Sequence, residues 1–117
     1  MTIQERVVGS VIVLDLSGKL VLGDGDMLLK DKIHSLVFQG SKQIILNMGG
    51  VSYVDSSGLG ALVASSVTAK NNSAQIKLVS LTKRLHDLLV ISKLVNVFET
   101  FDSEAEAINS FAAQATA

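Results

Sequence analysis

The sequence predicts an α/β fold, in which a mixed, mostly parallel sheet of about four to five strands has about four helices packed against it. Three observations predict this fold. Short β-rich apolar runs alternate with longer segments of helical periodicity, two β-rich runs joined by Gly9 and Ser10 open the chain, and 117 residues suffice for one domain but not for two. We therefore expect a single domain over residues 1–117 with the element order β-β-α-β-α-β-α-β-α.

The two opening runs are expected to form a hairpin. TIQERVV at residues 2–8 and VIVLDLSG at residues 11–18 are separated only by Gly9 and Ser10, which is typical of a tight turn between antiparallel strands. The second run is apolar on both faces, and one of these faces carries Ile12, Leu14 and Leu16.

The first helix is predicted over residues 27–40, after a loop that contains two glycines. Its apolar residues recur at helical spacing, and they are Leu29, Ile33, Leu36 and Val37. Gly40 is expected to end the helix, and either Asp24 or Asp26 is expected to cap its start.

Two more strands surround the second helix. KQIILNM at residues 42–48 and AQIKLVS at residues 74–80 are short apolar runs typical of buried strands. The helix between them is expected to end at residues 70–72 and to bury one face, made of Leu59, Leu62, Val63, Ser66 and Val67.

The chain then predicts a helix, a strand and a last helix. Thr82 is expected to cap the helix at residues 82–92, which carries Leu85, Leu88 and Leu89 on one side. VNVFET at residues 95–100 predicts a short strand. Ser103 and Glu106 have the spacing of a capping box at the start of the helix over residues 102–113.

Composition excludes several classes of function. The net charge is -1, from 10 basic and 11 acidic residues, and no basic block is present, so we expect neither a nucleic-acid nor a membrane partner. The chain has no cysteine, so thiolate metal sites and cysteine nucleophiles are excluded. No signal peptide or membrane-spanning run is recognisable, and we expect a cytoplasmic protein without a metal or cofactor.

The stretch YVDSSGLGAL, at positions 53 to 62, is the strongest candidate site. It follows a predicted strand and leads into a helix, at the end of the sheet where α/β proteins place functional groups. A serine nucleophile there would need the pattern G-x-S-x-G, but Asp55 and Leu59 occupy the two glycine positions around Ser57. His34 and His86 fall inside predicted helices, so we do not expect a hydrolase.

Two other ligand sites match the sequence poorly. Gly58 and Gly60 begin a G-x-G-x-x-G motif, but Val63 stands at its third position. The run GDGD at positions 23 to 26 is too short for a calcium loop and is better interpreted as a turn with a helix cap.

The remaining interpretations of this stretch are a helix cap and a phosphorylation site. Asp and Ser are preferred N-caps, and we assign Ser56 to the cap or turn. A cap does not account for Gly58 in the first turn, and we interpret this glycine as open space through which another protein reaches Ser57. A phosphate on Ser57 would be tolerated at the helix start and would add a charge of about -1.5 to -2 to the surface.

The stretch IILNMGGVSYVDSSGLGAL resembles the signature of the STAS domain of bacterial anti-sigma factor antagonists. LDLSGKL, with its G-x-L turn, and KRLHDLLVISKLVNVFETFDSEAEAI are also similar to segments of that family, so the resemblance covers almost the whole chain. It implies a STAS fold and a binding module that carries out no chemistry itself.

In this family the antagonist binds an anti-sigma factor that is also a serine kinase. The resemblance implies that the kinase phosphorylates Ser57 and is then released, and that a PP2C-like phosphatase restores the unmodified serine. It also implies a partner-binding surface around this serine, made of Asp24, Asp55, Ser56, Ser57, Gly58 and Leu59.

Two departures from the family pattern concern partner choice and local backbone. Val21 stands where an acidic residue often follows G-x-L, and we expect Asp24 to replace it. Ser92 and Lys93 stand at the usual Thr-Gly, so Lys93 is expected to adopt a conformation that glycine often supplies unless the turn differs. The alternative function is a STAS scaffold in a signalling or transport complex that controls no sigma factor.

Overall fold

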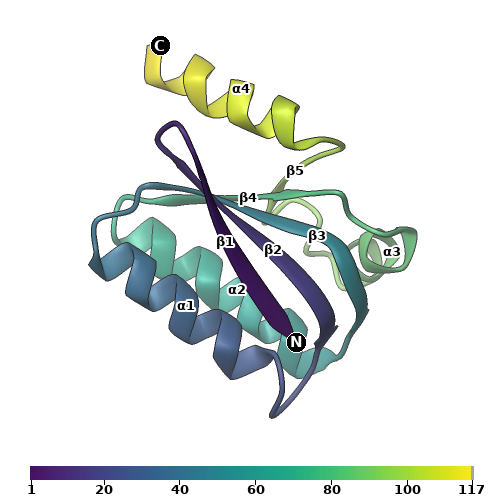
Figure 1. Ribbon diagram of the computed structural model, residues 1–117. Helices are drawn as coiled ribbons and strands as arrows, with labels where there is room; N and C mark the ends of the chain where they lie inside the picture. The colour runs from purple at the N-terminus through teal and green to yellow at the C-terminus, as the bar shows by residue number, and fades with distance from the viewer. Residues whose placement is uncertain (117) are drawn as a thin grey trace.

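The computed structural model describes residues 1–116, with side chains described through residue 113, so residue 117 lies outside the description. The element order is the predicted one (Figure 1). The strands are β1 (Thr2–Val8), β2 (Val11–Leu20), β3 (Gln43–Val54), β4 (Gln75–Val79) and β5 (Glu99–Phe101). The helices are α1 (Asp26–Phe38), α2 (Ser56–Asn71), α3 (Lys83–Ile91) and α4 (Glu104–Thr116).

The five strands form one mixed sheet in the order β1-β2-β3-β4-β5. β1 pairs with β2 in the antiparallel sense, whereas the other three pairs are parallel, so the fold class and the hairpin are confirmed. Gly9 takes a left-handed conformation (φ 62°) in the hairpin turn. The carboxyl ends of β2, β3, β4 and β5 therefore lie at the same end of the sheet.

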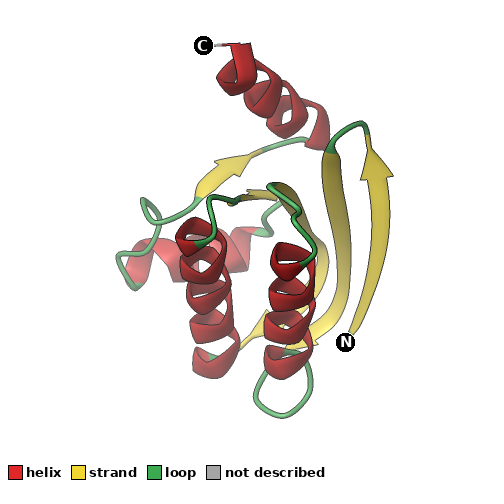
Figure 2. Ribbon diagram, turned by 90° about the vertical axis from the view of Figure 1, so that its left-hand side faces the viewer, coloured by secondary structure: helices red, strands yellow, loops and turns green. Residues whose placement is uncertain are grey.

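Helices cover both faces of the sheet (Figures 1 and 2). The α1 and α2 helices pack side by side on one face, over a core that includes Leu14, Leu46 and Leu78. The α4 helix lies on the other face, where Phe111 packs with Val13 and others in a second, smaller cluster. The α3 helix adds Leu85 and Leu89 to the larger core, close to the carboxyl end of β3.

Three predicted helix boundaries are confirmed, one at the C-terminus of a helix and two at the N-termini of others. Gly40 (φ 96°) follows α1, and the N–H of Ser41 donates to the carbonyl of Leu36, which is the Schellman pattern. Thr82 Oγ1 accepts a hydrogen bond from the N–H of Leu85 at 3.2 Å. Ser103 Oγ likewise accepts from the N–H of Glu106 at 3.2 Å.

Other boundaries differ from the prediction. Neither Asp24 nor Asp26 caps α1, because the N-cap position is Gly25 and the buried Asp26 is the first helical residue. β3 continues to Val54, well beyond the predicted end, because an irregular register lets Gly50 pair with β2. β5 begins only at Glu99, since the N–H of Val97 donates to the carbonyl of Leu94 in a turn.

The buried face of α2 also differs from the predicted one. Of the five residues assigned to it, only Leu62 is fully buried, and Val67 is 51% exposed. The buried face consists of Gly58, Ala61, Leu62, Ser65 and Ala69, and all of these residues except Leu62 are small. Small residues allow a helix to approach its neighbours closely, so steric fit outweighs hydrophobic periodicity here.

Candidate functional site

Asp55 joins the ends of two strands to the start of α2. Its backbone is extended, and its Oδ1 accepts a hydrogen bond from the N–H of Gly58 at 2.8 Å, as an N-cap does. Its Oδ2 accepts from the N–H of Leu22 at 3.0 Å, and its own N–H donates to the carbonyl of Leu20 at 3.3 Å. One side chain thus attaches the loop after β2 to the helix that carries both serines.

These contacts stabilise the ionised form of Asp55. The backbone N–H of Leu22, followed by that of Gly58, lowers the pKa of the carboxyl group below its usual value. The carboxylate is therefore charged at neutral pH and lies at the positive end of the α2 dipole.

The two serines are the first two residues of α2, and their exposure differs. Ser56 is exposed and Ser57 is half-buried. The assignment of Ser56 to the cap or turn was wrong, because Asp55 is the N-cap and Ser56 is the first helical residue. Among the side chains that the structure describes, neither hydroxyl is hydrogen-bonded. The choice of Ser57 as the phosphorylated residue stays a prediction.

Gly58 is buried, and the space beside it is not open. A Cβ added to this residue would lie 1.9 Å from the carbonyl oxygen of Leu20, far inside the contact distance. The interpretation of Gly58 as room for another protein was therefore wrong. This glycine allows α2 to touch the backbone of β2, which places Ser57 beside the loop that follows β2.

Asp24 and Leu59 belong to the same region in different ways. Asp24 is exposed in the loop before α1, and its Oδ1 lies 2.9 Å from the amino group of Met1. Leu59 is half-buried and packs against the core, so only part of its side chain faces outward. The structure brings Asp24, Asp55, Ser56 and Ser57 to one end of the molecule. Their role in binding a partner stays a prediction.

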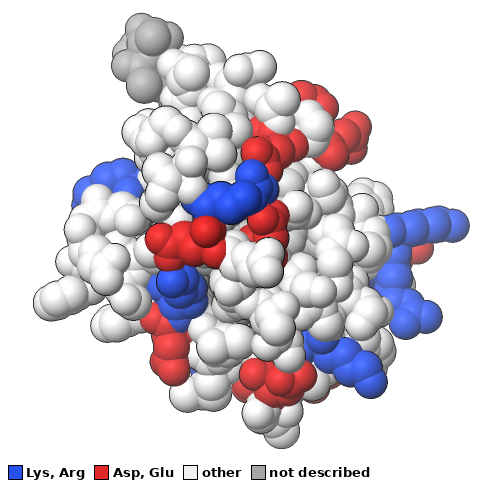
Figure 3. Space-filling model, in the orientation of Figure 1, with Lys and Arg blue, Asp and Glu red and all other residues white. Residues whose placement is uncertain are grey.

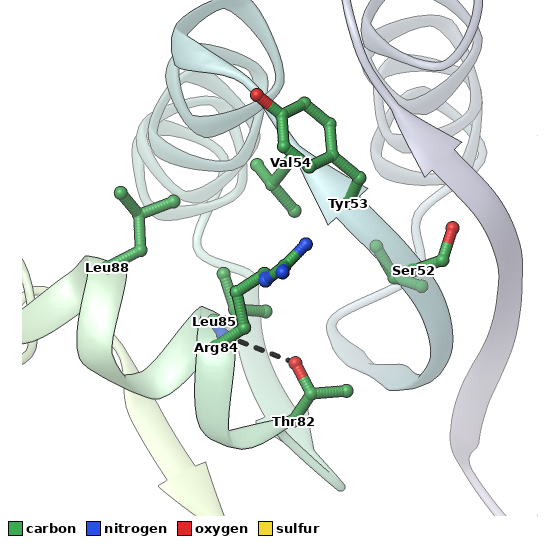
Figure 4. Close-up of a pocket in the computed structure, with 8 residues that line it drawn as sticks. Ser52, Tyr53, Val54, Thr82, Arg84, Leu85 and Leu88 are labelled. Atoms are coloured by element: carbon green, nitrogen blue, oxygen red, sulfur yellow. Dashed lines mark hydrogen bonds between the residues drawn. The ribbon is translucent and has the colours of Figure 1, made fainter.

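The sequence did not indicate that α3 borders this site. A small cavity of about 20 Å³ lies between the end of β3 and α3, and the guanidinium of Arg84 is directed between these elements, near Tyr53 and Val54 (Figure 4). A wider, shallow hollow beside it is lined mainly by Tyr53, Arg84, Leu88 and Ile91. The single tyrosine, two residues before the D-S-S motif, was the only signal in the sequence that could have indicated this surface.

Apolar side chains are exposed around the site. Leu22, in the loop held by Asp55, is 72% exposed, and Ile91, at the end of α3, is 79% exposed. Tyr53, just before the serines, is 46% exposed. Exposed apolar groups close to a candidate modification site are typical of a protein-binding surface.

The histidines and carboxylates do not build an alternative site. His34 lines a hollow with Lys30 and Thr68, while His86 lines another with Ser80 and Asp102. Within the described part of the chain, no group of three or more His, Cys, Asp or Glu side chains could hold a metal ion. None of the helices in that part combines the length and the hydrophobicity that a membrane span requires.

Comparison with known proteins identifies one family. The family model of the STAS domain matches residues 2–107. The anti-sigma F factor antagonist of Paenibacillus polymyxa is 24% identical over 98 residues, which are 84% of each chain.

Solved structures with the same fold include two kinds of protein. The phosphorylated form of SpoIIAA from Bacillus aligns with a TM-score of 0.72 and 24% identity, over 94% of this chain and 99% of that one. A sulfate transporter family protein from Wolinella succinogenes aligns with a TM-score of 0.75 and 17% identity, over 96% of this chain and 93% of that one.

Proposed function

This chain belongs to the STAS domain family, and from that premise we propose that it is an anti-sigma factor antagonist controlled by phosphorylation of Ser57. In its unmodified state it binds an anti-sigma factor that is also a serine kinase, and the sigma factor is set free to direct transcription. Phosphorylation of Ser57 releases the kinase, and a PP2C-like phosphatase returns the chain to its binding state.

The observation that carries this proposal is the position of Ser57 at the start of α2 beside a loop held by Asp55. A phosphate there is near the positive end of the helix dipole, which favours it by about 0.3–1 kcal/mol. The ionised Asp55 opposes it, but this repulsion is weakened by solvent and salt because the carboxylate lies at the surface. Both effects are small beside the stability of a folded domain, about 5–15 kcal/mol, so the modified chain stays folded while the charge of its surface changes.

The change in surface charge is what releases the partner. A phosphoryl group adds a charge of about -1.5 to -2 next to the exposed Leu22 and Tyr53. An apolar contact with another protein at this place would then have to desolvate the phosphate, which strongly disfavours binding.

In this proposal the chain is a substrate and not an enzyme. No side chain that the structure describes forms a hydrogen bond with the hydroxyl of Ser57, and Asp55 uses both carboxylate oxygens to accept backbone hydrogen bonds. The kinase supplies ATP and the catalytic groups, so the chain itself needs no cofactor. We place this exchange in the cytoplasm, in agreement with the absence of cysteine from the sequence.

Mass spectrometry after incubation with ATP and an anti-sigma factor kinase from the same organism tests the proposal. We expect one phosphate, on Ser57. A phosphate on Ser56 alone, or on neither serine, would contradict it. We also expect that Ser57→Asp weakens kinase binding and leaves the circular dichroism spectrum unchanged, whereas Ser57→Ala still binds.

A second candidate function is a scaffold domain in another signalling or transport complex. It is favoured by the similarity of the fold to the sulfate transporter family protein. A pull-down from the native cell with wild-type and Ser57→Asp chains separates the two functions. A kinase that only the wild-type chain retains supports the antagonist, whereas a transporter subunit retained equally by both chains supports the scaffold.

A further inference from the structure

The hollow beside α3 joins a basic cluster to an exposed apolar surface. Lys19 pairs with Tyr53 across β2 and β3, and Lys83 and Arg84 line the hollow together with Tyr53. We use the name Tyr53 surface for Lys19, Tyr53, Lys83, Arg84, Leu88 and Ile91. Figure 3 shows basic side chains gathered on the flank of the molecule where α3 lies.

The positive charges of this surface are not neutralised within the chain. Among the described side chains, those of Lys19, Lys83 and Arg84 are in no ion pair or hydrogen bond. Two cations, Lys83 and Arg84, and one anion, Asp87, line the hollow. Lys19 adds a third cation next to Tyr53 on the neighbouring strand. By contrast, Arg6 is paired with both Asp15 and Glu104. A chain with a net charge of -1 thus carries a local positive surface.

The same surface exposes apolar area. Ile91 is 79% exposed and Tyr53 is 46% exposed, and the half-buried Leu88 lines the same hollow. Apolar side chains surrounded by unpaired cations are complementary to a segment that presents apolar and acidic residues together.

We propose that the Tyr53 surface docks an acidic, apolar segment of the kinase partner, and that phosphorylation of Ser57 releases this segment by competing for the same cations. This inference rests on the proposed function. Tyr53 and Val54 lie against Arg84 and directly precede Asp55 and the two serines, so the phosphate is added at the border of the surface. Charges interact there over roughly 8–10 Å at physiological salt, so the phosphate reduces the attraction for an acidic partner.

A defined peptide tests the docking surface without the kinase. The probe is a fluorescein-labelled peptide of repeated Leu-Glu-Glu, and the comparison probe is a repeated Leu-Lys-Lys peptide of the same length. We expect only the acidic peptide to bind the unmodified chain, with changes in the backbone amide NMR signals of Tyr53, Arg84 and Ile91. Equal binding of both peptides, or signal changes confined to α1 or α4, would overturn the proposal.

Variants separate the charged from the apolar contribution. The double variant Lys83→Glu with Arg84→Glu places carboxylates in the first turn of α3, where they favour the helix, and should weaken acidic-peptide binding by about tenfold or more. Its control, Lys30→Glu with Lys70→Glu, makes the same charge change at exposed sites on α1 and α2 and should leave binding unchanged.

The apolar contribution is tested by Ile91→Ser, which should weaken binding. Its control is Phe38→Ser, which should not, although Phe38 is also exposed (87%) at the end of a helix, α1. Equal effects within either pair would refute the proposed surface.

The kinase assay distinguishes this inference from the proposed function. If Ser57→Asp releases the kinase but the Lys83→Glu and Arg84→Glu double variant binds it with unchanged affinity, the docking surface is wrong and the proposed function stands. If the acidic peptide binds at Tyr53 but no kinase phosphorylates Ser57, the surface stands and the proposed function fails.

Discussion

Gly58 of α2 lies directly against the carbonyl group of Leu20 at the end of β2, and a Cβ at position 58 would be 1.9 Å from that oxygen. The same carbonyl accepts the N–H of Asp55. The start of α2 and the end of β2 are thus held together by backbone contacts, and the position of the two serines depends on them.

Gly58→Ala is expected to destabilise the protein by about 3 kcal/mol, because the added methyl group overlaps backbone atoms that cannot move aside without disturbing the sheet. Gly60→Ala is the matched control, since no heavy atom lies within 4 Å of its added Cβ. This change should stabilise the helix by about 0.5–1 kcal/mol. Urea unfolding monitored by circular dichroism measures both, and equal effects would contradict the packing described for Gly58.

Asp55→Asn is expected to lower the stability of the protein at neutral pH and to make that stability depend less on pH. The pKa of Asp55 is lower in the folded chain than in the unfolded chain, so its stabilising contribution is complete above the unfolded pKa, near 4. That contribution is lost as the pH falls through the lower, folded value. Thermal unfolding of both chains between pH 3 and pH 7 should therefore show the difference in Tm shrinking toward the acid end. A difference that is constant over this range would show that the charge of Asp55 has no role.

Lys93→Gly is expected to stabilise the protein by about 1 kcal/mol. Lys93 adopts a left-handed conformation (φ 62°) as α3 ends, and the N–H of Leu94 donates to the carbonyl of Leu89. Glycine adopts this conformation without the strain that a Cβ introduces. Lys93→Ala keeps the Cβ and should change the stability little, so urea unfolding of the two variants isolates the effect of the backbone. An equal gain in both would assign it to the loss of the lysine charge.

Lys77→Ala is expected to destabilise the protein by about 2–4 kcal/mol, mainly by loosening α4. The side chain is fully buried between β4 and α4, where its Nζ lies 2.6 Å from Ser110 Oγ and 4.2 Å from the centre of the Phe111 ring. Lys77→Met fills the same space without a charge and should cost less, because a buried charge also carries a desolvation penalty. Urea unfolding ranks the three chains, and a Met variant as unstable as the Ala variant would show that the charge itself holds α4.

The sequence predicted the order and type of all nine elements that the structure describes, because apolar spacing and turn residues are local signals. Gly9 and Gly40 were correctly assigned to turns, and the unusual conformation expected of Lys93 is present. The family resemblance also identified the D-S-S motif, and the structure places this motif at the carboxyl end of the sheet.

Features that depend on fit between distant segments were predicted poorly. Periodicity placed Val67 on the buried face of α2, because hydrophobic spacing does not reveal that Ala61 and Ser65 pack more closely. The length of β3 was underestimated because Gly50 pairs with Ser17 only in the folded sheet. The space beside Gly58 was misjudged because its neighbour, Leu20, is far away in the sequence.

The sequence by itself determined the family, the α/β fold and the candidate phosphorylation site, since each depends on residues that are neighbours along the chain. Only the tertiary structure decided that Asp55 caps α2 and holds the loop at Leu22, and that Tyr53 shares a surface with Arg84 and Ile91. These relationships join segments from different strands and helices. Their physical cause is the parallel pairing of the strands, which brings the ends of β2 and β3 to one edge of the sheet beside α3.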